Sequence, residues 1–290
     1  MNPRSPRSTP SEHPLGASPA QYLSVPDGTI AYDDAGAGPL VLCVPSIGDV
    51  RAEYRFLRPQ LLAAGFRVVT MDLRGHGDSS AAFPDYAAPA IGQDIIALAR
   101  HFEAGPVAVI GTSKAGGSAV WAAAHAPDLL DRLVLIDSFV RAHSGDWLLK
   151  TVMNVLLSRP WGPALWTMYF PKFYPSRKPA DFAPYRTQLR ANLRERGRIE
   201  ALRAMMNDDE ASNAAVEASL ARVTAPTLVV MGTKDPDFKD PVAEAQWIAD
   251  QVHGTVLLVA GAGHYPHVEM PEQVGPEITR FLSVATSHAS

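Results

Sequence analysis

The chain reads Gly111-Thr112-Ser113-Lys114-Ala115-Gly116 directly after the apolar run Val107-Ala108-Val109-Ile110, and a helix-like segment follows from Gly117 to Ala126. This order predicts a sharp turn at Ser113 between a strand and a helix. Small residues two positions before and two after the serine leave room for such a turn. The turn exposes the hydroxyl, and N–H groups at the helix start can face a developing negative charge. Ser113 is therefore a candidate nucleophile, and the alternative is a serine that only caps the helix.

Length and composition fit one large α/β unit, or one such unit with an insertion. The chain has 290 residues, 47% of them hydrophobic, which supplies a full core. Its formal net charge of −4 gives no general attraction to nucleic acid. Cys43 is the only cysteine, which excludes an intramolecular disulfide, and its apolar neighbours predict a buried side chain.

The N-terminal segment, residues 1–20, is rich in Pro, Ser and Arg and contains no apolar stretch. A secretory signal would need a run of about 7–15 apolar residues, so a disordered tail is predicted instead. Nowhere does the sequence approach the roughly 18 apolar residues of a membrane span. We therefore expect a soluble, cytoplasmic protein that does not engage a membrane; the sequence does not predict its oligomeric state.

Short apolar runs alternate with segments of helical periodicity along most of the chain. The first two runs, Gln21–Val25 and Thr29–Asp33, form a hairpin around Pro26-Asp27-Gly28. Further strands are predicted at Leu40–Val44, Arg67–Met71, Val107–Ile110, Leu133–Ile136, Thr227–Met231 and Thr255–Val259, and helices at Phe56–Ala64, Ala88–Phe102, Gly117–Ala126, Val242–Gln251 and Pro271–Ala285. Continuous apolar strands separated by helices are typical of an α/β fold, a mostly parallel twisted sheet with helices on both faces.

The alternation breaks between Phe139 and about Ala221, where helical periodicity continues and no strand is predicted. We expect a core of residues 21–138 and 222–290, interrupted by an inserted α-helical cap at 139–221.

A serine hydroxyl needs a general base, and the base needs an orienting acid. His264 follows the strand Thr255–Val259 through the small loop Ala260-Gly261-Ala262-Gly263, so we expect it at the same carboxyl edge of the sheet as Ser113. Asp235 also follows a strand. The order Ser113, Asp235, His264 is the one expected for a nucleophile in a strand-to-helix turn.

Other residues compete for these roles. His267 is the nearest rival base, and Asp237 and Asp137 are rival acids. His76 lies in a glycine-bracketed loop and is interpreted as structural.

No metal or nucleotide cofactor is expected. The sequence has no His-Glu-x-x-His and no Cys pair for a metal. Gly36-Ala37-Gly38 lacks the third glycine and the following helix of a dinucleotide site.

From Gln21 to the final helix the chain resembles the α/β-hydrolase superfamily, in its form as a serine hydrolase with a helical cap. The matching pieces are the nucleophile elbow around Ser113, Met71-Asp72-Leu73-Arg74-Gly75-His76-Gly77-Asp78-Ser79, Gly232-Thr233-Lys234-Asp235 and Gly261-Ala262-Gly263-His264-Tyr265-Pro266. The resemblance implies a catalytic triad of Ser113, Asp235 and His264 under the cap. Some family members use an acid after the strand that Leu133–Ile136 resembles, which keeps Asp137 as an alternative.

Two departures from the family pattern concern catalysis. Ala115 stands where glycine is usual in the elbow, and alanine is small enough for the turn to survive. Pro45-Ser46-Ile47-Gly48-Asp49 replaces the His-Gly of many members. By alignment to that pattern, the backbone N–H groups of Ile47 and Lys114 form the oxyanion hole, where one missing donor would cost about 3–4 kcal/mol. The Lys114 side chain either pairs with an acid or meets the oxyanion or a substrate carboxylate.

The predicted cap is rich in aromatic residues. Residues 139–185 hold ten of the chain's 23, which are Phe139, Trp147, Trp161, Trp166, Tyr169, Phe170, Phe173, Tyr174, Phe182 and Tyr185. Packing of the cap explains most of them, and a few are expected to line an apolar acyl pocket. Three arginines, Arg186, Arg190 and Arg194, recur every fourth residue and so lie on one helix face. Such a face is usually solvated, and the alternative is a site that recognises an anionic substrate or an acidic partner.

Together these features predict a serine hydrolase of small-molecule acyl substrates, with carboxylic esters favoured over thioesters, lactones and amides. One alternative keeps the triad in a lyase, a carbon–carbon bond hydrolase or a perhydrolase. Another is a catalytically weak ligand-binding receptor on the same fold, which the altered oxyanion loop would favour.

Overall fold

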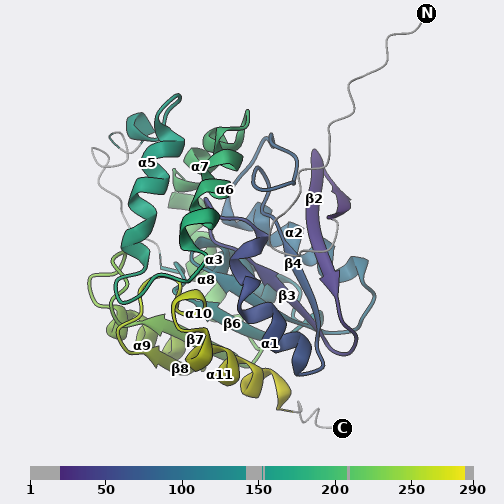
Figure 1. The fold of residues 1–290 in the computed structure, drawn as a ribbon. Coiled ribbons are helices and arrows are strands. Elements are labelled where there is room, and N and C mark those ends of the chain that lie inside the picture. Colours follow the sequence, from purple (N-terminus) through teal and green to yellow (C-terminus); the bar gives the residue numbers. More distant parts are fainter. Residues whose placement is uncertain (1–19, 142–151, 153, 208–209, 285–290) are drawn as a thin grey trace, which may run out of the picture.

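The structure, a computed structural model, describes residues 20–141, 152, 154–207 and 210–284. Its strands form one eight-stranded sheet in the order β1-β2-β4-β3-β5-β6-β7-β8 (Figure 1). They are β1 (Gln21–Val25), β2 (Gly28–Ala35), β3 (Leu40–Val44), β4 (Arg67–Met71), β5 (Val107–Thr112), β6 (Leu130–Ile136), β7 (Thr227–Gly232) and β8 (Thr255–Val259). The pairings of β1 with β2 and of β2 with β4 are antiparallel, and the other pairings are parallel. The predicted α/β fold with a mostly parallel sheet is confirmed.

Helices cover both faces of this sheet (Figure 1). Outside the insertion they are the 3₁₀ turn η1 (Arg51–Arg55), α1 (Leu57–Ala63), α2 (Ala88–His101), α3 (Lys114–His125), α9 (Pro241–Val252), α10 (Pro266–Glu269) and α11 (Pro271–Ser283). In β3, Val41 and Cys43 belong to the buried cluster that includes apolar residues of α1 and α11, whereas Leu42 belongs to the second cluster, which includes those of α2, α3 and α9. Both faces of the strand are therefore buried, which explains its uninterrupted apolar sequence.

The element bounds differ from the predicted ones by a few residues in either direction. Strand β6 begins at Leu130 instead of Leu133, and β5 ends at Thr112 instead of Ile110. The longer β5 keeps its pairing with β6 to the end, since Thr112 lies opposite Ile136.

Between β6 and β7 the described residues form helices and no strand, as predicted. These are α5 (Gly162–Tyr169), the 3₁₀ turn η2 (Phe170–Phe173), α6 (Phe182–Arg194), α7 (Arg198–Met206) and α8 (Glu210–Leu220). Helices α5, α6 and α7 lie together at the top of Figure 1, while α8 packs against α3 and α2. Its residue Val216 lies so close to Gly117 that a side chain on that glycine would crowd it.

Aromatic side chains anchor the insertion to the rest of the molecule. Phe170, Phe173 and Tyr174 are buried, and their rings pack against Tyr265 with centroids 5.4–5.6 Å apart. Ordinary packing therefore accounts for these rings, as expected, whereas Trp161 is exposed.

Some expectations concern residues outside the described ranges. Trp147 and nearly all of the predicted N-terminal tail belong to this group.

Cys43 is buried, as expected. Among the described helices, none combines the length and the apolar character that a bilayer crossing requires.

The burial of both sheet faces predicts that two leucines of the sheet contribute very differently to the free energy of unfolding. Leu42 is 1% exposed in β3 and Leu258 is 42% exposed in β8. Leu42→Ala should lower the free energy of unfolding by about 2–5 kcal/mol, because it removes buried methyl groups and leaves a cavity. Leu258→Ala, the matched control, should change it by less than about 0.5 kcal/mol. Urea denaturation measures both, and equal losses would contradict the packing described.

Candidate active site

Ser113 occupies the turn between β5 and α3. Its backbone has φ 59° and ψ −132°, a left-handed conformation that is rare for a residue with a side chain. The N–H of Ser113 donates to the carbonyl of Ile136 at 2.9 Å, and its own carbonyl accepts from Gly116 at 3.0 Å and Phe139 at 3.2 Å. Its hydroxyl makes no capping hydrogen bond to α3 within the described part of the chain. The turn therefore does not use the serine as a helix cap.

Small neighbours make this turn possible. A side chain on Gly111 would come within 2.9 Å of the carbonyl of Ala115, and one on Gly116 within 1.9 Å of the Ser138 hydroxyl. Ala115 is buried without displacing the turn. Alanine thus fits where glycine is usual.

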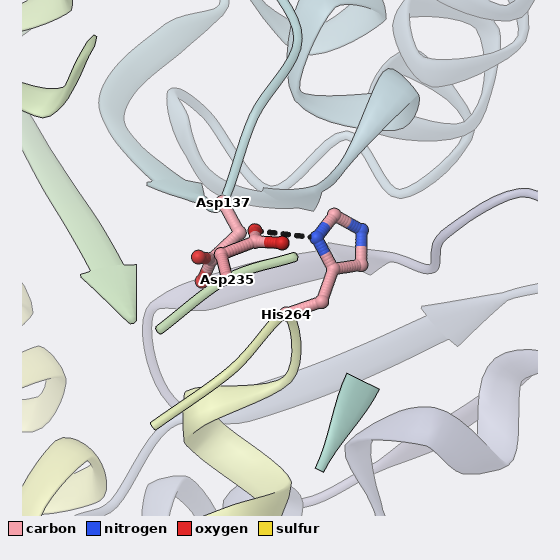
Figure 2. Close-up of side chains that lie close together, drawn as sticks. All are labelled: Asp137, Asp235 and His264. Carbon is pink, nitrogen blue, oxygen red and sulfur yellow. Dashed lines mark hydrogen bonds and ion pairs between the residues drawn. The ribbon is translucent and has the colours of Figure 1, made fainter. Parts of the chain in front are cut away.

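His264 and Asp235 meet at the carboxyl edge of the sheet. The imidazole Nδ1 lies 2.7 Å from Oδ2 of Asp235, and both side chains are buried (Figure 2). The other oxygen of Asp235 accepts from the N–H of Asp237 at 2.9 Å. Because an ionised carboxylate only accepts hydrogen bonds, Nδ1 carries the proton, and Nε2 of the neutral ring has a free lone pair.

Electrostatics reinforces this pair. Burial lowers the pKa of His264, but the charge of Asp235, its hydrogen bond to the ring and the charges of Asp237 and Glu53 together outweigh burial. The pKa of the imidazole therefore lies above its ordinary value. Burial alone raises the pKa of Asp235, but the charge of His264 and the hydrogen bonds it receives lower it below its ordinary value. Protonated imidazole next to ionised carboxylate is thus a stable arrangement here.

The rival acids occupy different places. Asp237 lies farther from the ring, with its Oδ2 3.9 Å from Nδ1 of His264. Asp137, at the end of β6, accepts instead from the N–H of Gly232 at 3.0 Å. Of the three carboxyl groups, only that of Asp235 hydrogen-bonds to the imidazole.

Asp137, Asp235 and His264 have polar atoms within 4.8 Å of one another, a spacing that would also suit a cation. The 2.7 Å contact places a proton on Nδ1, however, so that nitrogen has no lone pair to offer a metal. The geometry fits a hydrogen-bonded group better than a ligand set.

Phe139 links the serine to the histidine. Its N–H donates to the Ser113 carbonyl, and its ring centroid lies 6.0 Å from that of His264. The hydrogen bonds of the described residues include none between the Ser113 hydroxyl and His264. In enzymes in general, a hydrogen bond between a nucleophile and its base often forms fully only when substrate is bound.

The loop of residues 45–49 follows β3, and most of its N–H groups have acceptors. Ser46 donates to Oε2 of Glu53 at 2.7 Å, Gly48 to Nε2 of His76 at 3.0 Å, and Asp49 to the carbonyl of Ser46 at 3.3 Å. For the N–H of Ile47, no acceptor is found among the described residues. This is the position that the family alignment suggests as an oxyanion donor.

Two further histidines are occupied elsewhere. His76 contacts the Arg74 carbonyl through Nδ1, and burial lowers the pKa of His76 to about 4, so its Nε2 is free to accept from Gly48. It supports the loop, in line with the structural role expected. His267 packs on Tyr54 and faces Glu53, with 3.2 Å between Nε2 and Oε1. The rival base therefore lies against Glu53, and no contact between His267 and Asp235 is found among the described residues.

The insertion is tied to both the loop and the elbow. Trp166 donates through Nε1 to the Gly48 carbonyl at 3.0 Å, and the Tyr185 hydroxyl donates to Asp49. Burial and the nearby charge of Glu53 raise the pKa of Asp49 to about 8. Lys114 donates through Nζ to the carbonyl of Met205 at 2.7 Å, so this side chain contacts the end of α7.

Glu269 is a buried carboxylate that crosslinks two loops of the site, and the sequence did not predict it. Its Oε1 accepts from the N–H groups of Ser176 at 2.7 Å and Arg177 at 2.8 Å, and its Oε2 accepts from Gly263 at 2.7 Å. One carboxylate therefore holds the loop before His264 against the segment that follows η2. Its partners are backbone groups, which leave no residue-type signal in the sequence.

Comparison with known proteins gives concordant matches over most of the chain. The sequence profile of the "Alpha/beta hydrolase family" matches residues 41–276. The 3-oxoadipate enol-lactonase 2 of Acinetobacter baylyi is 25% identical over 207 residues, which are 71% of this chain and 74% of that protein. The 2-(acetamidomethylene)succinate hydrolase of Mesorhizobium japonicum is 26% identical over 274 residues, 88% of this chain and 91% of that one. The solved structure of a hydrolase from Pseudomonas aeruginosa has a TM-score of 0.78 and 26% identity, and covers 92% of this chain and 99% of its own.

The role of Glu269 can be tested against its neighbour Glu272, which pairs with Arg177 at an exposed position. Glu269→Ala should lower the free energy of unfolding by about 3–5 kcal/mol, because three backbone donors lose their acceptor. Glu272→Ala should change it by less than about 1 kcal/mol, as is usual for exposed ion pairs. Chemical denaturation of both variants is the measurement, and a loss at Glu269 no larger than at Glu272 would refute the role.

Proposed function

Because the chain belongs to the α/β hydrolase family, we propose that it is a serine hydrolase that cleaves a carboxylic ester or a related acyl bond. Ser113 is the nucleophile, His264 the general base and Asp235 the acid that orients it. The observation that carries this proposal is the 2.7 Å hydrogen bond from His264 to Asp235, at the sheet edge where the Ser113 turn also lies.

The reaction follows from these roles. The Ser113 oxygen attacks the substrate carbonyl while Nε2 of His264 takes its proton, and Asp235 stabilises the imidazolium that forms. The tetrahedral intermediate collapses when His264 delivers this proton to the leaving group. Water, deprotonated by the same imidazole, then attacks the acyl-enzyme, and the acid product and free Ser113 are released.

The oxyanion of each tetrahedral intermediate needs backbone donors. We propose the N–H of Ile47 and that of Lys114, at the start of α3, where the helix dipole also favours negative charge. The hydrogen bonds of the 45–49 loop support Ile47, since its three neighbouring N–H groups already have acceptors. Each donor is worth about 3–4 kcal/mol in the transition state.

We further propose that residues 139–221 act as the cap that shapes the substrate site. The bonds from Trp166 to Gly48 and from Lys114 to Met205 support this role, because they join the insertion to the loop and to the elbow. A small acyl substrate with an apolar part suits the aromatic residues of this segment. The relatives named for a lactone and for an acetamido compound agree with acyl chemistry in general.

A fluorophosphonate probe, which reacts with activated serines, tests the nucleophile. The intact protein should be labelled at neutral pH and should hydrolyse short- or medium-chain chromogenic esters, and Ser113→Ala should lose both by at least about a thousandfold. Ser118→Ala is the matched control, since Ser118 is a buried serine of α3 with no hydrogen-bond partner in the described residues. Labelling that survives in Ser113→Ala, or is absent from the intact protein, would exclude the mechanism and favour a binding role.

A further inference from the structure

Two carboxyl groups lie side by side behind the imidazole, those of Asp235 and Asp137 (Figure 2). Their residues are 3% and 0% exposed, respectively. None of the ion pairs among the described residues joins either carboxyl to a lysine or an arginine. The positive charge that this pair meets there is the imidazolium of His264, which hydrogen-bonds to Asp235 and not to Asp137.

The partners of the four carboxyl oxygens are unequal. Both oxygens of Asp235 accept hydrogen bonds, one from His264 and one from the N–H of Asp237. Oδ1 of Asp137 accepts from the N–H of Gly232 at 3.0 Å, whereas its Oδ2 is buried and has no donor among the described residues. A buried carboxylate oxygen without a donor is strongly unfavourable. A protonated Oδ2, by contrast, would itself be a donor, with the Asp235 carboxylate as its acceptor.

The surrounding charges determine which carboxyl keeps the proton. Asp137 faces the carboxyl groups of Asp235 and Asp237, and the phenol of Tyr169 contacts Asp237 at 3.4 Å. Burial first, and then the charge of Asp235, raise the pKa of Asp137 well above its ordinary value, whereas the pKa of Asp235 is lowered. Two buried carboxylates in contact do not both ionise, and the one that faces His264 takes the charge.

We propose that Asp137 is a positioning residue that keeps its proton and donates it in a hydrogen bond from Oδ2 to the Asp235 carboxylate. This inference rests on the proposed function for its catalytic consequence. The proton stays on Asp137 throughout the reaction, so no charge is transferred. This hydrogen bond fixes the orientation of the Asp235 carboxylate on the side away from His264. It thereby keeps the imidazole in the orientation needed to take the proton of Ser113.

The backbone supports this placement. Asp137 adopts φ 42°, a left-handed conformation that is unusual for a residue other than glycine, and its N–H donates to the Val230 carbonyl at 2.9 Å. The preceding residue, Ile136, accepts from the N–H of Ser113. The end of β6 therefore fixes the elbow and the second carboxyl together.

The location of the proton can be measured without any turnover. Infrared spectroscopy at neutral pH should show the carbonyl stretch of a buried carboxylic acid that disappears in Asp137→Asn. Asp49→Asn is the matched control, because Asp49 is a second buried carboxyl, with a pKa raised to about 8, and its replacement should leave the Asp137 band in place. If Asp137→Asn removes no carboxylic acid band, the proposal is wrong, whatever the outcome for Ser113.

The positioning role is tested by the pH profile of kcat/KM. Activity needs neutral His264 and is lost as the pH falls through the raised pKa of the imidazole. Asparagine keeps a donor and adds no charge, so Asp137→Asn should leave the acid limb in place and kcat within about threefold. Asp137→Ala should lower kcat about 10- to 100-fold with KM nearly unchanged, because Asp235 loses its support.

An ionised Asp137 would give a different result. Asp137→Asn would then remove a negative charge near His264. The pKa of His264 would fall, and the acid limb of the profile would move down by about one pH unit or more. That shift would overturn the proposal even if Asp137→Ala fails to fold. A role in folding alone would also be indicated if a folded Asp137→Ala kept the full kcat.

Discussion

At Ser113 the backbone must pass from a buried strand into a helix with φ 59°, a conformation that costs about 1–3 kcal/mol in a residue with a side chain. Hydrogen bonds on both sides of Ser113 stabilise this strained conformation. The Ile136 carbonyl at the end of β6 accepts from the Ser113 N–H, and the N–H of Phe139 donates to the Ser113 carbonyl. Glycines at 111 and 116 admit the close backbone approach that the turn needs. Without this packing, the hydroxyl would not be presented at the sheet edge.

The parallel sheet then brings the partners together. Strands β5, β6, β7 and β8 are neighbours, so the segments that follow them meet at one edge. These segments contribute Ser113, Asp137, Asp235 and His264. The insertion adds hydrogen bonds to the 45–49 loop and to Lys114, and Glu269 fastens the histidine loop to it. The geometry of the site is thus a property of the sheet topology, refined by long-range contacts.

Much of this organisation is visible in the sequence because its causes are local. Strands β3, β4 and β8 have the predicted bounds, since apolar runs and turn residues act over a few positions. The elbow and the chain order of Ser113, Asp235 and His264 are likewise readable from short motifs. The structure brings Asp235 and His264 together, while the contact of His264 with Ser113 remains part of the proposal.

Other features depend on contacts that no local pattern encodes. Glu269 binds backbone N–H groups about 90 residues away in sequence, and backbone donors are the same at every non-proline position. The bond from Lys114 to the Met205 carbonyl is likewise invisible in the sequence, because its acceptor is a backbone group. The proximity of Asp137 to Asp235 depends on the register of β6 and β7, which places Asp137 beside Gly232.

A crystal structure of the protein after reaction with a phosphonate ester would test the central claim most directly, since phosphonates mimic the tetrahedral intermediate. The account predicts phosphorus bonded to the Ser113 oxygen, the phosphoryl oxygen within about 3 Å of the Ile47 and Lys114 N–H groups, and Nε2 of His264 facing the adduct. An adduct on another residue, or a His264 ring turned away from Ser113 with its bond to Asp235 intact, would contradict it.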